Sequence, residues 1–169
     1  MASPSLADGI RSIFRRKGLF QLPRAHMAVL GSNPCHRPIL CVAASPACGT
    51  GNALYDDGIQ YGIDPVYALA FFRHESSYGK YGIAATNKGL GNIRCSSGYQ
   101  CKNGFRAYTT WQAGYDDWYK LIRYYVDNWH KSTIYEIIPT YAPSSENDTQ
   151  EYIQSIEESV STWRKQVQA

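Results

Sequence analysis

The residue best suited to chemistry in this sequence is Glu75, which follows a long apolar segment and precedes a Ser-Ser-Tyr-Gly turn. A glutamate in the last turn of a helix lies beside the partial negative charge of the helix end. Burial beside apolar neighbours also disfavours the ionised form. Both effects raise the pKa toward the range of a proton donor near neutral pH, so Glu75 is a candidate general acid. An ordinary surface glutamate that ends a helix is the alternative interpretation.

The segment 64–79 must position this carboxyl group, and its sequence predicts a buried helix. Asp64 is a suitable N-cap, and Pro65 fits the first helical position, where a missing N–H costs nothing. Nearly every residue from 66 to 72 is apolar, which is typical of a helix buried on all sides. Ser76, Ser77 and Gly79 are expected to end the helix, which leaves Glu75 at the last turn of a central element.

Four further helices are expected around it, and together they predict a mainly α domain. Their limits follow from capping residues and helical spacing of apolar side chains: 52–61, 111–129, a short helix after Thr133 that Pro139 ends, and a last helix opened by Asp148. The second of these carries an aromatic stripe that is expected to lie in the core: Trp118, Leu121, Ile122, Tyr125 and Trp129.

Between the helices, residues 81–108 are rich in glycine and predict loops with a small β-hairpin. The fold class is therefore a helical domain with a small hairpin insertion. The stretch from Gly79 to Gly114 contains no aspartate or glutamate.

The chain has five cysteines, and none forms a pair with the spacing of a zinc site. Cys95 and Cys101 bracket a turn sequence, and Cys41 and Cys48 bracket a second short loop, so both pairs are disulfide candidates. Disulfides indicate an oxidising, extracytoplasmic setting, with Cys35 left over. Reduced, buried thiols in a cytosolic protein are the alternative.

Composition limits the classes of function. The 169 residues carry a net charge of +3 with scattered lysines and arginines, which argues against a nucleic-acid partner. No apolar run of about 18 residues occurs, so no transmembrane segment is expected. The 14 tyrosines and 4 tryptophans suit a core, but they also suit a sugar-binding site, where a ring packs on a pyranose.

The first forty residues differ from the rest and show no periodicity after residue 17. They do not read as a signal peptide, because no apolar core follows the basic residues. We expect a poorly ordered N-terminal extension over 1–40 and one domain over 41–169.

Several segments, taken in order, resemble the endo-β-N-acetylglucosaminidase family, glycoside hydrolase family 73. The resemblance rests on FFRHESSYG (71–79), GLGNIRC (89–95), the aromatic residues of the helix after 110, and YAPSSENDTQEYI (141–153). It implies a lysozyme-like fold and hydrolysis of peptidoglycan glycan strands between N-acetylglucosamine and N-acetylmuramic acid. It further implies a secreted or wall-associated monomer without a cofactor or metal.

The resemblance also assigns roles to single residues. Glu75 matches the catalytic acid, and Tyr141 matches a tyrosine near it. The residues expected to contact substrate are Ser77, Tyr78, Gly91, Asn92, Ile93 and Trp118. Tyr152 falls in the same late motif as Tyr141, with a structural role expected.

The sequence departs from a scheme with two catalytic carboxylates. Such schemes place a second carboxylate about 5–9.5 Å from the acid, but the hairpin insertion has none. The remaining options are Asp116, Asp117, Glu136, Glu146 and Asp148. Each of them can also be explained as a structural charge at a helix start or in a loop. We therefore expect help from the 2-acetamido group of the substrate, with Tyr141 orienting it. A lytic transglycosylase or muramidase on the same fold is an alternative, and a non-catalytic glycan-binding module is another.

Overall fold

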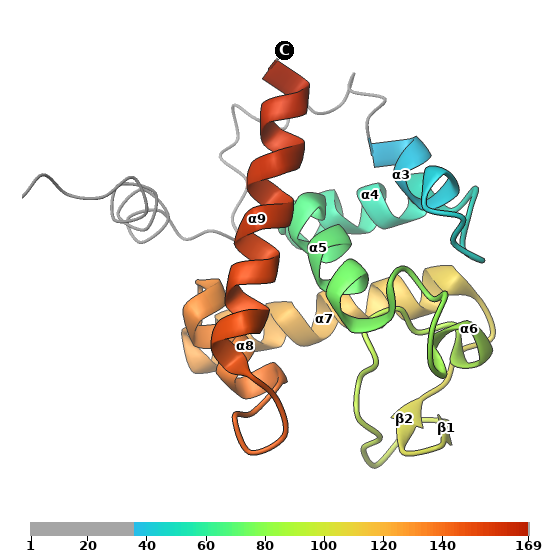
Figure 1. Ribbon diagram of the computed structural model, residues 1–169. Coiled ribbons are helices and arrows are strands. Elements are labelled where there is room, and N and C mark those ends of the chain that lie inside the picture. Colours follow the sequence, from blue (N-terminus) through green and yellow to red (C-terminus); the bar gives the residue numbers. More distant parts are fainter. Residues whose placement is uncertain (1–35, 169) are drawn as a thin grey trace, which may run out of the picture.

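The computed structural model describes residues 36–168 (Figure 1), so residues 1–35 of the predicted extension, including Cys35, lie outside the described residues. The described part is mainly helical with one two-stranded antiparallel sheet, which confirms the predicted fold class. Its elements are α3 (His36–Val42), α4 (Gly51–Tyr61), α5 (Pro65–Ser76), α6 (Ala84–Asn87), β1 (Cys101–Lys102), β2 (Phe105–Arg106), α7 (Trp111–Trp129), α8 (Ile134–Tyr141) and α9 (Thr149–Gln168).

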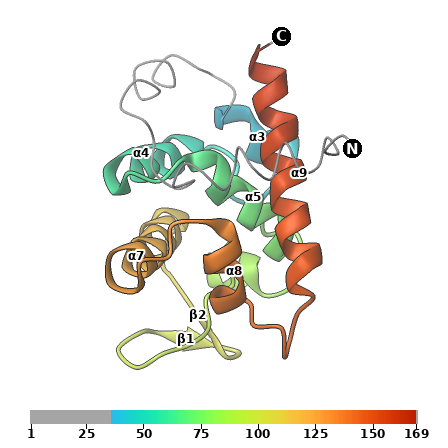
Figure 2. The same ribbon diagram turned by 90° about the vertical axis from the view of Figure 1, so that its left-hand side faces the viewer.

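Helix α5 is the buried centre of the domain, as its sequence predicts. Asp64 caps it by accepting a hydrogen bond from the Val66 N–H at 3.0 Å, and Pro65 occupies the first turn. Every residue from 65 to 72 is buried. Helices α4 and α9 pack against α5, and α9 runs along one side of it in both views (Figures 1 and 2).

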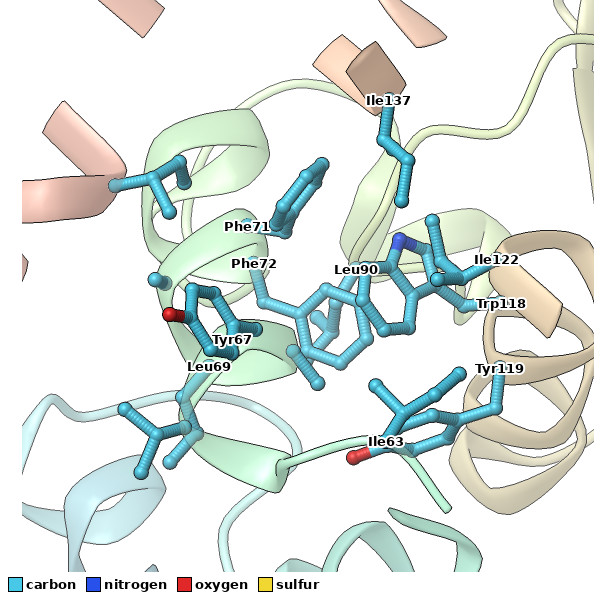
Figure 3. Packing of buried hydrophobic residues seen from close by; sticks show 14 of the residues in the cluster. Ile63, Tyr67, Leu69, Phe71, Phe72, Leu90, Trp118, Tyr119, Ile122 and Ile137 are labelled. Atoms are coloured by element: carbon cyan, nitrogen blue, oxygen red, sulfur yellow. The ribbon is translucent and has the colours of Figure 1, made fainter. Parts of the chain in front are cut away.

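The aromatic stripe of α7 closes the core from the other side. Trp118 is fully buried, and its ring lies 5.2 Å from Phe71 and 5.3 Å from Phe72 between ring centres. Figure 3 shows these three rings meeting between α5 and α7. The predicted burial of one residue of the stripe is wrong, because Trp129 is 46% exposed at the end of α7.

Pro139 does not end its helix, contrary to the sequence prediction. Pro139 lies inside α8, and the Ala142 N–H still donates to the Ile138 carbonyl at 2.8 Å. Proline has no N–H to donate to the carbonyl four residues earlier, so the loss is one hydrogen bond near the helix end. The extra half-turn brings Tyr141 against the core.

The hairpin lies within the glycine-rich segment, as predicted. Its turn, however, is at Asn103 and Gly104 and not between Cys95 and Cys101. Lys102 pairs with Phe105 across Asn103 and Gly104, which have φ values of 53° and 81°. Asn-Gly is the preferred sequence for a two-residue turn with both φ values positive. The expected turn between Cys95 and Cys101 is instead the loop that their disulfide closes.

Helix α3 starts at His36, before the predicted boundary at residue 41, and Leu40 is fully buried in the core. The Cys41–Cys48 disulfide joins the end of α3 to the following loop, so both predicted disulfides are present. Two disulfides are compatible with a secreted protein. Within residues 36–168, no helix is long and apolar enough to cross a membrane.

Candidate functional site

The turn after Glu75 holds an unusual backbone conformation. Ser77, Tyr78 and Gly79 follow one another with φ values of 47°, 60° and 83°. The Ser77 N–H donates to the Arg73 carbonyl, the 5→1 bond of an αL helix end, and the Tyr78 N–H donates to the Phe72 carbonyl. Left-handed conformation costs a non-glycine residue roughly 1–2 kcal/mol, so contacts around the turn must hold it.

Ser76 supplies two of these contacts. Its buried hydroxyl oxygen accepts from the Gly79 N–H at 2.9 Å, and the hydroxyl donates to the Leu90 carbonyl at 3.0 Å. A third contact comes from the disulfide-closed loop at 41–48, where the Ser45 hydroxyl donates to the Tyr78 carbonyl at 2.6 Å. The backbone beside Glu75 is therefore fixed by two neighbouring segments.

The Glu75 side chain is largely buried but reaches the surface. The Tyr152 hydroxyl donates to Glu75 Oε1 at 2.6 Å. The Asn92 amide donates to the Glu75 main-chain carbonyl at 2.8 Å and is 3.5 Å from Oε2. Burial raises the pKa of Glu75 to about 7, against the opposing effect of the two hydrogen bonds. The predicted upward direction is confirmed.

The loop at 91–93 passes so close to the core that Gly91 has no room for a side chain. A Cβ at this position would lie 2.5 Å from Trp118 Cδ1 and 2.8 Å from the Tyr141 hydroxyl. That hydroxyl donates to the Gly91 carbonyl. Burial, followed by the charge of Glu75, keeps the pKa of Tyr141 well above its ordinary value. Tyr141 is thus a neutral phenol within the electrostatic reach of the carboxyl group.

Asn92 presents an unused acceptor beside the acid. Its backbone is left-handed, with φ of 46°, a conformation that asparagine tolerates better than most residues. Its Oδ1 is buried and has no hydrogen-bond partner among the described residues.

Three residues expected to contact substrate have packing roles instead. Trp118 is fully buried, Tyr78 is 7% exposed and Ile93 is 8% exposed. Their side chains offer almost no surface to a ligand. Ser77 remains partly exposed at the turn. Of the sequence-predicted residues, the structure brings Gly91, Asn92 and Tyr141 to Glu75.

The five candidates for a second carboxylate all have structural contacts: Asp116, Asp117, Glu136, Glu146 and Asp148. Asp117 is deeply buried and paired with Arg106 at 2.9 Å. Glu146 is more accessible than Asp117, with 53% of its side chain exposed. It pairs with Arg94, which follows the 91–93 loop.

Sequence reasoning missed the contact between Tyr152 and Glu75. Tyr152 is 2% exposed at the start of α9, on the same face as Ile156 and Val160. The helical spacing of these three residues could have indicated that Tyr152 faces inward toward α5.

In the part of the chain between 36 and 168, no cluster of three or more His, Cys, Asp or Glu side chains could hold a metal ion. Comparison of the chain with protein-family models, curated proteins and solved structures found no match.

Proposed function

We propose that this protein is a secreted or wall-associated peptidoglycan hydrolase of the endo-β-N-acetylglucosaminidase type, with a lysozyme-like fold and Glu75 as the general acid. The observation that carries the proposal is the Glu75 carboxyl group, which has a pKa of about 7, reaches the surface and is held by Tyr152 on a fixed turn. The resemblance of the motifs at 71–79, 89–95 and 141–153 supplies the substrate class.

The chemistry requires a proton on the leaving oxygen while positive charge develops on the sugar. A carboxyl group with a pKa near 7 is protonated in a large fraction of molecules at neutral pH and still gives up its proton readily. Since the Tyr152 hydroxyl donates to Oε1, Oε2 is the oxygen from which Glu75 would donate its proton. That oxygen lies 3.5 Å from the Asn92 amide nitrogen.

The second half of the reaction is assigned to the substrate. The hairpin insertion carries no carboxylate, and the five candidate carboxylates named above are engaged in caps, hydrogen bonds and ion pairs. Attack by the 2-acetamido oxygen on the anomeric carbon would then replace a protein nucleophile and give retention of configuration. Measurement of the first anomer released by NMR tests this step, and an inverted product would exclude it.

The same shortage of carboxylates favours one competing reaction, that of a lytic transglycosylase. There the muramoyl 6-hydroxyl attacks the anomeric carbon, and the product is lighter by one water. Mass spectrometry of digested peptidoglycan distinguishes that product from hydrolytic ends.

Glu75→Gln tests whether the protein is an enzyme at all. We expect loss of cell-wall lysis by at least 100-fold with binding to peptidoglycan retained, because glutamine keeps the shape but has no proton to donate. Glu158→Gln, an exposed change on α9, is the matched control and should lyse normally. Lysis by Glu75→Gln at the unmodified rate would exclude Glu75 as the acid, and binding without lysis by the unmodified protein would indicate a glycan-binding module.

A further inference from the structure

His74, the neighbour of the candidate acid, makes a contact that the proposed reaction does not use. Its imidazole lies against the phenol ring of Tyr152, with ring centres 3.8 Å apart and planes inclined by 18°. His74 itself is exposed, and one face of its ring covers Tyr152. Tyr152 is 2% exposed, and Phe71 contacts it as well, with centroids 5.5 Å apart.

This stack restricts the orientation of the Tyr152 ring, whose hydroxyl contacts Glu75. The phenol ring contacts both Phe71 and His74 of α5, and its hydroxyl donates to Glu75 Oε1 at 2.6 Å. Two consecutive residues of α5 therefore contact different parts of Tyr152: His74 covers its ring, and Glu75 accepts a hydrogen bond from its hydroxyl.

We propose that His74 and Tyr152 form a positioning pair that holds the Glu75 carboxyl group in one orientation, with Oε1 accepting from the phenol and Oε2 facing the Asn92 amide. The inference rests on the proposed function for its catalytic meaning. Neither residue donates a proton in the reaction; both act through Glu75.

The direction of the effect follows from which form of Glu75 each contact favours. A phenol that donates to a carboxylate stabilises the anion and lowers the carboxyl pKa. In this protein the Tyr152 and Asn92 hydrogen bonds oppose the raising effect of burial. Loss of the Tyr152 hydroxyl would leave burial less opposed, so the pKa of Glu75 would rise further.

The groups around the pair come from three elements. On α5, Arg73 donates to Ser159 of α9. On α9, the charge of Glu151 raises the pKa of His74, whereas burial lowers it by more, so the net direction is downward and imidazole is the main form at neutral pH. Tyr141 of α8 keeps its proton, as described above. The predicted role of His74 therefore depends on its flat ring and not on its charge.

The test is a titration of the Glu75 carboxyl carbon by NMR in the full chain labelled at glutamate, with the signal assigned by its absence in Glu75→Gln. Tyr152→Phe should raise the Glu75 pKa by about one unit, since the hydrogen bond is lost and the ring is kept. His74→Ala should shift it upward by a smaller amount, and His74→Phe should restore the original value. Glu151→Gln, which changes a neighbouring charge without touching the stack, is the control and should leave Glu75 unchanged.

The pH at which lysis falls on the alkaline side should rise more in Tyr152→Phe than in His74→Ala, with kcat reduced and KM little changed. An unchanged Glu75 titration in both His74→Ala and Tyr152→Phe, in protein that melts as a folded domain, would overturn the inference. His74→Phe behaving like His74→Ala would equally overturn it, because stacking would not be the cause. If the titrations move as predicted but the unmodified protein lyses no cell wall, the positioning pair stands and the proposed function fails.

Discussion

At the scale of single residues, Glu75 links the site to the stability of the fold. Its pKa is about 7 in the folded protein against 4.5 for a free side chain. A carboxyl group with a raised folded pKa lowers stability at high pH: the cost is absent below the unfolded pKa and complete above the folded one. The fold thus tolerates an unfavourable carboxylate at neutral and alkaline pH.

Glu75→Gln should therefore stabilise the protein in a pH-dependent way. Relative to the unmodified chain, we expect little difference near pH 4 and a gain on the order of 3 kcal/mol at pH 8. Urea denaturation at the two pH values checks this. A stability difference that is the same at both would show that Glu75 does not titrate abnormally.

Gly91 gives a second residue-scale prediction, since a methyl group there would collide with Trp118 and Tyr141. Gly91→Ala should cost about 1–3 kcal/mol of folding free energy, in the range of overpacked cores. It should also reduce lysis, because the Tyr141 hydroxyl would lose the Gly91 carbonyl. Thr86→Ala on the exposed face of α6 should change neither property. Wild-type stability for Gly91→Ala in thermal denaturation would contradict the packing described for this loop.

At the scale of elements, most helix limits follow from local signals, whereas long-range contacts do not. The Asp64 cap, the Gly62 stop, the Thr110 cap and the capping box at Thr133 could all be predicted, because each depends on neighbours in sequence. The burial of Leu40 and the exposure of Trp129 could not, since both depend on which segments pack there.

The two disulfides make a matched pair for testing how elements support the site. Their cysteines are 7 and 6 residues apart, so loop closure predicts a similar loss of about 2 kcal/mol when either pair is changed to serine. Only the Cys41–Cys48 loop contacts the turn after Glu75, through Ser45 and the Tyr78 carbonyl. We expect the Cys41→Ser/Cys48→Ser variant to lose more lytic activity than Cys95→Ser/Cys101→Ser at equal folded fraction, measured by denaturation and turbidity. Equal losses of activity would contradict a supporting role for the first loop.

At the scale of the whole molecule, the candidate site is assembled from segments that are distant in sequence. The acid comes from α5, the phenol on its Oε1 from α9, the neighbouring amide from the 91–93 loop and a second phenol from α8. The sequence identifies Glu75, Asn92 and Tyr141 through motifs. It does not identify the Tyr152 contact, because 77 positions separate the two residues and only the packing of α9 on α5 joins them. The same packing brings His74 onto the Tyr152 ring.

The most direct test of the central claim is product analysis by mass spectrometry after digestion of purified peptidoglycan, with the unmodified protein and Glu75→Gln side by side. The unmodified protein should release fragments with N-acetylglucosamine at the reducing end, and Glu75→Gln should release none above background. Fragments ending in reducing or anhydro-muramic acid, or equal release by Glu75→Gln, would contradict the account.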